Sequence, residues 1–183
     1  MESGDKKSLR SRCSAIAKGL SPEERAGADR RILEQVLALP EYRKADILFV
    51  YVSMEGEPDT RELIRRALKG GKRVCVPRCL SRQEMAAAEI TNLEALQPVP
   101  PYGILEPRPE APVIPPAEIP LGIIPCVSAG PDGARLGHGA GFYDRFLQEA
   151  AGMKTVCLCY RAAASEEIPM ERHDRFMDRV IFG

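Results

Sequence analysis

A glycine-dense stretch is the part of the sequence best suited to hold an anion. Residues 130–146 read GPDGARLGHGAGFYDRF and place five glycines within twelve positions, between an apolar run and a predicted helix. Glycine permits positive φ and lets backbone amides approach a ligand closely. A loop that ends at a helix N-terminus also presents unpaired N–H groups and the positive end of the helix dipole. The stretch therefore predicts a phosphate-binding loop. Arg135 adds a charged guanidinium group that can donate paired hydrogen bonds to a phosphate.

The glycine spacing separates this loop from two well-known phosphate motifs. No Gly-Lys-Ser/Thr follows, as a Walker A loop requires, and the spacing at 137–141 is G-x-G-x-G rather than G-x-G-x-x-G. Glycine content alone thus suggests phosphate binding without a diagnostic motif. A tight strand-to-helix turn that binds no ligand is the alternative interpretation.

A second basic cluster lies near the N-terminus. Lys6 and Arg10 are four residues apart on a predicted helix over 6–18, so they project from one face and could grip a triphosphate. The alternative is an ordinary solvated helix face. We expect Arg10 and Arg135 to be largely solvent-facing when no ligand is bound.

One acidic residue lies where a substrate could reach it. Glu57 belongs to the loop 53–58, which follows a predicted buried strand. In open α/β sheets, ligands bind outside the carboxyl ends of the strands. Glu57 is therefore a candidate substrate contact, and the alternative is an exposed loop glutamate.

The elements that must position these residues alternate between strands and helices. Short, nearly continuous apolar runs are typical of strands buried on both faces of a parallel sheet. The predicted strands cover about 45–52, 73–77, 121–125 and 155–160, and the later predicted helices begin at Pro22 and cover about 59–69 and 142–151. Ser21 and Glu24 form a capping-box pattern at the start of the second helix. This order predicts one α/β domain over 1–183, with three layers and a mostly parallel sheet.

A proline-rich segment interrupts this alternation. Nine of the 16 prolines lie between Pro98 and Pro120. Proline lacks a backbone N–H, so the segment cannot form a regular helix or a central strand. We expect an ordered loop wrapped over a site, and a flexible linker is the alternative.

The overall charge excludes functions that depend on a strong field. Lys plus Arg equals Asp plus Glu, at 26 each among 183 residues, so no net charge draws the chain to nucleic acid or to an acidic membrane. The opening residues MESGDKKSLR lack the apolar core of a signal peptide, and no apolar run approaches the roughly 20 residues that span a bilayer. We therefore expect a cytoplasmic monomer that acts on small molecules, without a membrane or nucleic-acid partner.

The cysteines and histidines indicate no catalytic or metal-binding order. There are six cysteines without a C-x-x-C pair, and only His138 and His173 could help to ligate zinc. We expect buried free thiols, with a zinc site as the weaker alternative.

Several short motifs, in register along nearly the whole chain, resemble the 5-formyltetrahydrofolate cyclo-ligase family. The matching segments are Lys6-Lys7-Ser8-Leu9-Arg10, Ser21-Pro22-Glu23-Glu24-Arg25, Glu57-Pro58-Asp59-Thr60, Tyr102-Gly103-Ile104-Leu105-Glu106-Pro107, and Arg135-Leu136-Gly137 through Tyr143-Asp144-Arg145-Phe146. The resemblance implies a Rossmann-like α/β/α fold. It also implies a reaction in which 5-formyltetrahydrofolate and ATP, with Mg²⁺, give 5,10-methenyltetrahydrofolate, ADP and phosphate.

The resemblance also implies roles for particular residues. Lys6 and Arg135 are implied to be catalytic. The implied nucleotide-binding residues are Lys6, Lys7, Arg10, Arg135, Leu136, Gly137, His138, Gly139, Ala140, Gly141, Phe142 and Tyr143. The implied folate contacts are Val52, Glu57 and Tyr102, and the implied Mg²⁺ ligands are Asp144 and Asp174.

The sequence departs from the family pattern within the glycine-dense loop. His138 stands where many members have Tyr or Arg, Ala140 replaces Gly or Lys, and Phe142 replaces a Tyr. We expect altered affinity rather than lost activity. Two alternatives stay open: a folate-binding protein without turnover, and a sugar-phosphate isomerase or acyl-CoA transferase on a related fold.

Overall fold

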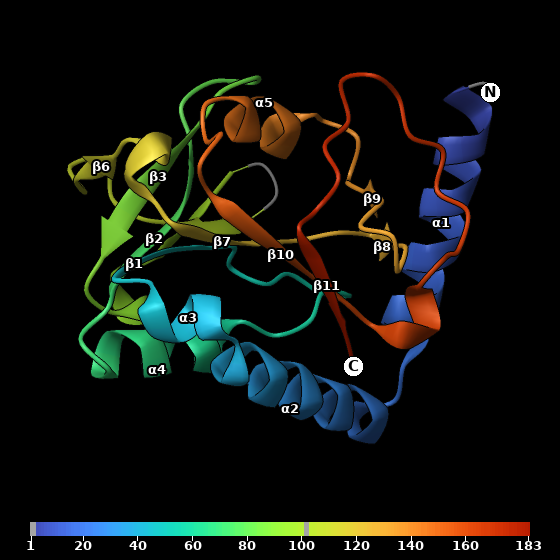
Figure 1. Cartoon of the computed structure of the whole chain (residues 1–183), viewed down its shortest axis with the longest axis horizontal. Coiled ribbons are helices and arrows are strands. Elements are labelled where there is room, and N and C mark those ends of the chain that lie inside the picture. Colours follow the sequence, from blue (N-terminus) through green and yellow to red (C-terminus); the bar gives the residue numbers. More distant parts are fainter. Residues whose placement is uncertain (1–2, 101–102) are drawn as a thin grey trace.

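A mostly parallel sheet runs through the centre of the molecule in the computed structural model, which describes residues 3–100 and 103–183 (Figure 1). Its seven strands follow the order β11-β10-β7-β1-β2-β3-β6. They are β1 (Ile47–Val50), β2 (Arg73–Cys79), β3 (Met85–Ile90), β6 (Val113–Ile114), β7 (Leu121–Ile124), β10 (Lys154–Cys159) and β11 (Arg179–Phe182). The pairs from β11 to β2 are parallel, and β3 pairs antiparallel with both β2 and β6.

Helices cover both faces of this sheet, with α2, α3 and α4 beneath it and α5 above it in Figure 1. The helices are α1 (Ser3–Gly19), α2 (Pro22–Ala38), α3 (Pro40–Lys44), α4 (Arg61–Lys69) and α5 (Phe142–Gln148). Short 3-10 turns are η1 (Leu93–Ala95), η2 (Pro116–Glu118) and η3 (Arg161–Ala163). Two small antiparallel ribbons pair β4 (Gln97–Val99) with β5 (Ile104–Glu106), and β8 (Ser128–Ala129) with β9 (Arg135–Leu136). The predicted three-layer α/β arrangement is confirmed.

Two apolar cores lie on opposite faces of the sheet because successive strand residues point to opposite sides. Leu48 and Val50 of β1 belong to the core shared with α1, α2 and α4. Their neighbours Ile47 and Phe49 belong to the second core, where Phe49 stacks on Phe146 of α5 with ring centroids 4.6 Å apart. Burial on both faces explains why β1 reads as a continuous apolar run rather than an alternating one.

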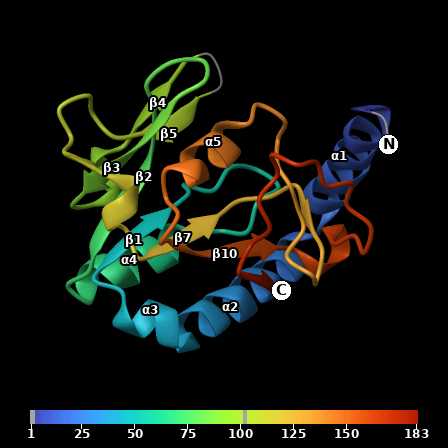
Figure 2. The same cartoon turned by 45° about the horizontal axis from the view of Figure 1, so that its top comes forward.

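The sequence signals for helix ends agree closely with the structure. Ser21 caps α2, and its hydroxyl accepts from Glu24 N while the Glu24 carboxylate accepts from Ser21 N, which completes the predicted capping box. Figure 2 shows α1 at one end of the molecule, beside the β8–β9 ribbon and the C-terminal segment 164–178. Among the described residues, no helix has both the length and the apolar character needed to cross a membrane.

The proline-rich segment contributes only peripheral strands, as predicted from its missing N–H groups. Its described residues include β5 and part of β4 in a separate ribbon, and β6 at the edge of the main sheet.

Five of the six cysteines are buried and free, while Cys79 is free and exposed. The expectation of buried thiols therefore fails at Cys79, the last residue of β2.

Candidate functional site: a glycine loop between two ends of the chain

The glycine loop, residues 137–141, leads from β9 into α5 and is built for close backbone approach. Gly139 and Gly141 have φ of 101° and 72°, a region that side chains other than glycine rarely adopt. Gly141 is the N-cap of α5, and no side chain caps this helix end. Among the hydrogen bonds between described residues, none uses an amide N–H of residues 137–141 as its donor. These amides are therefore free to bind an anion.

Two arginines hold carbonyl oxygens of the glycine loop. Arg10 Nε donates to Gly137 O at 2.7 Å, and Arg145 Nη2 donates to Ala140 O at 2.8 Å. In a trans peptide, the N–H points away from the carbonyl of the same unit. The amides of His138 and Gly141 therefore point away from these two arginines. The arginines act here as supports that orient the loop.

Arg135 occupies a buried position, so the expectation of a solvent-facing side chain is wrong for this residue. Only 3% of its side chain is exposed. Its guanidinium donates to Pro125 O at 3.0 Å and to Asp144 Oδ1 at 3.1 Å, and it lies over the Tyr143 ring. The reason is its place in β9, a strand whose two residues are both buried. Its Nε is buried without a hydrogen-bond partner in the described chain, so one donor at the base of the loop is unused.

Lys6 lies in a polar contact between the two ends of the chain. Its Nζ is 2.7 Å from Asp174 Oδ2 and 3.1 Å from Glu171 Oε1, and 12% of its side chain is exposed. Burial alone would lower the pKa of Lys6, but hydrogen bonds and charge attraction to these two carboxylates raise it. Lys6 therefore stays charged at neutral pH and cannot serve as a base. Lys7 is exposed.

The two predicted Mg²⁺ ligands take part in different ion pairs. Asp144 pairs with Arg135, and Asp174 pairs with Lys6. Burial would raise the pKa of Asp174, but the hydrogen bonds from Lys6 and from Glu171 N, together with charge attraction to Lys6 and His173, outweigh burial and lower this pKa. Across residues 3–100 and 103–183, no group of three or more His, Cys, Asp or Glu side chains is arranged to hold a metal. The residues fit Mg²⁺ only in the way typical of nucleotide enzymes, where one or two carboxylates act with substrate phosphates.

Glu57 is buried, so the alternative of an exposed loop glutamate is wrong. Its side chain is 5% exposed, and one carboxylate oxygen accepts from Met54 N at 2.8 Å. The other oxygen lies 2.8 Å from His138 Nε2 in the glycine loop. The structure thus joins a predicted folate contact directly to the predicted nucleotide loop.

Two side chains that sequence reasoning missed hold the Glu57 loop in place. The Tyr160 hydroxyl lies 2.8 Å from Asp29 Oδ1 and 3.1 Å from Glu57 O, and its one proton is shared between these two acceptors. Thr60 donates to Tyr51 O from its hydroxyl. Thr60 stands in one of the matched motifs, whereas Tyr160 ends a predicted strand with nothing to mark its role.

Of the two remaining predicted folate contacts, Val52 and Tyr102, the described residues include only Val52. Val52 is buried two residues beyond the carboxyl end of β1, with its side chain in the core that packs on α1, α2 and α4. Tyr102 lies outside the described residues. Of the two predicted contacts within the described residues, Glu57 is the one that hydrogen-bonds to the glycine loop.

Comparison with known proteins places this architecture, a mostly parallel α/β sheet with a glycine loop before α5, within one enzyme family. The sequence profile of the 5-formyltetrahydrofolate cyclo-ligase family matches residues 2–183. The 5-formyltetrahydrofolate cyclo-ligase of Mus musculus is 27% identical over 97% of this chain and 93% of its own length. That of Escherichia coli K12 is 29% identical over 90% of this chain and 92% of its own.

A solved structure is similar over nearly the same length. The NMR structure of the Aquifex aeolicus 5,10-methenyltetrahydrofolate synthetase has a TM-score of 0.86 and 27% identity, covering 97% of this chain and 89% of that one. The chain belongs to the 5-formyltetrahydrofolate cyclo-ligase family, a family of ligases in folate metabolism.

Proposed function

We propose that this protein catalyses the ATP-dependent cyclisation of 5-formyltetrahydrofolate to 5,10-methenyltetrahydrofolate, releasing ADP and phosphate. Family membership supports the folate substrate. The observation that carries the proposal is the 2.8 Å contact between Glu57 and His138, because it places a folate-binding candidate beside the free amides of the glycine loop. The proposed enzyme is a monomer of the cytoplasm that needs no nucleic-acid or membrane partner.

The glycine loop is proposed to receive the triphosphate of MgATP, with the metal ion entering as part of this substrate. Free amides at residues 137–141 supply donors, and Arg10 keeps two terminal guanidinium nitrogens for phosphate while its Nε supports the loop. Lys6 and the buried Arg135 supply positive charge at the edge and the base of the loop. Phosphoryl transfer depends mainly on such positioning and charge stabilisation.

The proposed chemistry has two steps. The formyl oxygen of the folate attacks the γ-phosphorus of ATP; the new O–P bond forms as the bond to ADP breaks. The second folate nitrogen then attacks the activated formyl carbon, a proton leaves this nitrogen, and phosphate departs with the former formyl oxygen. Asp144 and Asp174 are the carboxylates proposed to hold the Mg²⁺ that accompanies ATP. The residues of the chain hold both substrates in line and exclude water from the activated formyl group.

The first test of this proposal is the requirement for both MgATP and folate. We expect purified protein to convert 5-formyltetrahydrofolate to the methenyl product, followed by its near-ultraviolet absorbance, only when Mg²⁺ and ATP are both present. Equal product without ATP would exclude the proposed phosphoryl transfer. Binding of both substrates without product under any condition would favour a folate-binding protein without turnover.

Glu57→Gln tests the folate side of the site. A buried carboxylate that hydrogen-bonds a ligand contributes about 1.5–3 kcal/mol, so loss of its charge should lower kcat/KM for the folate roughly ten- to a hundredfold. The KM for ATP should change less than twofold, because Glu57 hydrogen-bonds to the side chain of His138 and not to the loop amides proposed to bind phosphate. Steady-state kinetics with each substrate varied in turn provide the measurement.

Glu55→Gln is the matched control for this experiment, since Glu55 is exposed in the same loop. It should leave both KM values unchanged. Unaltered folate kinetics in Glu57→Gln would instead limit Glu57 to holding Met54 and His138 in place.

A further inference from the structure

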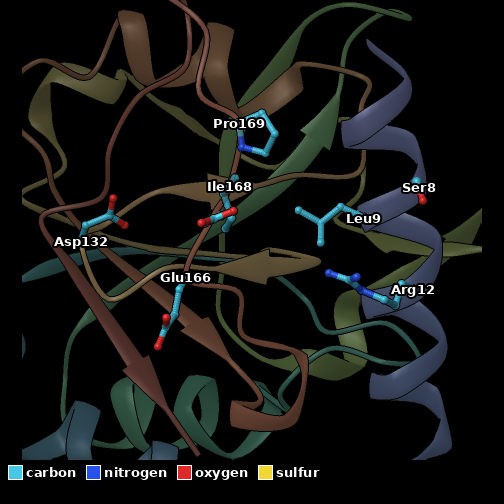
Figure 3. A pocket seen from close by; sticks show the side chains of 8 residues that line it. Ser8, Leu9, Arg12, Asp132, Glu166, Ile168 and Pro169 are labelled. Carbon is cyan, nitrogen blue, oxygen red and sulfur yellow. The ribbon is translucent and has the colours of Figure 1, made fainter. Parts of the chain in front are cut away.

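The side chain and the backbone of His138, in the glycine loop, face different partners. Its backbone N–H donates to no group among the described residues and is one of the amides proposed to bind phosphate. Its imidazole Nε2 lies 2.8 Å from Glu57 Oε1, which belongs to the carboxylate proposed to bind the folate. The imidazole takes no part in the lining of the cavity of about 630 Å³ beside α1 (Figure 3). Within the described chain, the hydrogen-bond partner of this side chain therefore lies on the folate side.

The contact between His138 and Glu57 is anchored from both backbones. Arg10 Nε donates at 2.7 Å to the carbonyl oxygen of the peptide unit that also contains His138 N. On the other side, Glu57 N donates to Met54 O at 3.1 Å, and the Tyr160 hydroxyl lies 3.1 Å from Glu57 O. The imidazole and the carboxylate thus project from two supported segments, so the fold itself sets their contact.

The Glu57 carboxylate depends on His138 for one of its two donors. Only 5% of this side chain is exposed, and a buried carboxylate needs hydrogen-bond donors in place of water. Met54 N donates to Oε2 at 2.8 Å, and His138 meets Oε1. Among the described residues, no other basic side chain pairs with Glu57. Without the imidazole, the Met54 amide alone would hold the carboxylate, which could then turn about its last bond.

We propose that His138 is a positioning residue for the folate, an inference that rests on the function proposed above. Its imidazole donates from Nε2 to Glu57 and fixes the direction in which the remaining lone pairs of this carboxylate meet the folate. Its backbone N–H serves the phosphates. The nucleotide-binding role implied by family resemblance then applies to the backbone of His138, and its side chain acts on the other substrate.

Three substitutions separate the N–H donor from the rest of the ring. His138→Gln carries an amide N–H about as far along the side chain as Nε2, His138→Asn carries it nearer the backbone, and His138→Leu removes it. Among the described residues, only glycines have positive φ, so the backbone at position 138 accepts all three. The His138 side chain is 49% exposed, which makes the risk to folding small. Thermal unfolding provides the control for each variant.

Steady-state kinetics with each substrate varied in turn test the assignment. His138→Leu and His138→Asn should lower kcat/KM for 5-formyltetrahydrofolate roughly tenfold, as expected for a lost hydrogen bond to a charged group, and should change the KM for MgATP by less than about twofold. His138→Gln should keep folate kinetics close to those of the parent protein. Equal losses in all three variants would overturn the role of the N–H donor. A raised KM for MgATP with unaltered folate kinetics would assign the side chain to the nucleotide instead.

A double-mutant cycle with Glu57→Ala tests whether His138 acts through Glu57. Calorimetry of folate binding is suited to this cycle because it does not require turnover. His138→Leu should weaken folate binding roughly tenfold in the parent protein but less than about twofold when Glu57→Ala is already present. The full loss in the Glu57→Ala background would mean that the imidazole contacts the folate directly, which would overturn the positioning role.

The parent protein separates this inference from the proposed function. Product formation by the parent, with folate kinetics unchanged in His138→Leu, would overturn the role of His138 alone. A parent protein that neither binds nor converts 5-formyltetrahydrofolate would overturn the proposed function and this inference with it.

Discussion

Arg135→Ala is expected to lower the free energy of unfolding by about 3 kcal/mol, although the sequence alone places this arginine in a solvent-facing binding role. The substitution leaves the Asp144 carboxylate and the Pro125 carbonyl without their donor. Removing one partner of a buried ion pair costs about 3–5 kcal/mol. The lower end applies because 22% of the Asp144 side chain is exposed. Urea unfolding followed by circular dichroism measures the loss.

Arg10→Ala is the matched comparison for this variant. Arg10 is only partly buried and donates to a backbone carbonyl. Its unfolding free energy should fall by about 1 kcal/mol, the net value of one hydrogen bond, while MgATP affinity should fall roughly tenfold or more. Equal stability of Arg135→Ala and the parent protein would contradict the structural role of Arg135.

Gly139→Val is expected to weaken MgATP binding at least a hundredfold. Residue 139 has φ of 101°, and a Cβ there would lie 3.4 Å from Arg10 Cζ. A branched side chain disfavours this backbone conformation and would also cover the amides offered to phosphate. Isothermal calorimetry with MgATP measures the affinity, and thermal unfolding measures the accompanying change in stability.

Gly71→Val separates backbone strain from ligand access. Gly71 has φ of 80° after α4, and a Cβ added to it would have no atom within 4 Å among the described residues. It should lower thermal stability by an amount similar to Gly139→Val while leaving MgATP affinity unchanged. If Gly139→Val bound MgATP like the parent protein, the glycine loop would be a structural turn only.

Much of the central fold could be predicted because its signals are local. The continuous apolar run around Phe49 indicates a strand buried on both faces, and Ser21 with Glu24 indicates where α2 begins. Glycine density likewise indicates the loop before α5. These signals depend on residues close together in the sequence, so they can be recognised without knowing the tertiary structure.

The strands and contacts that sequence reasoning missed depend on distant partners. β3 carries three consecutive alanines and pairs with β2 and β6, so its place comes from its neighbours rather than its composition. The burial of Arg135 depends on Asp144 and Pro125. The contact between Glu57 and His138 spans 81 positions, and neither residue type at its position indicates the other.

The ion pair between Lys6 and Asp174 has a consequence for biosynthesis. Its partners are 168 positions apart, and Lys6 belongs to α1, which is made before any strand of the sheet. A nascent chain can form α1 and α2 early, since helices need only local contacts. It cannot complete this ion pair, at the edge of the proposed nucleotide site, until residue 174 has emerged, which comes after most of the sheet has been made. Chains that terminate before residue 174 therefore lack this ion pair, so the proposed nucleotide site is completed only after every strand of the main sheet except β11 has been made.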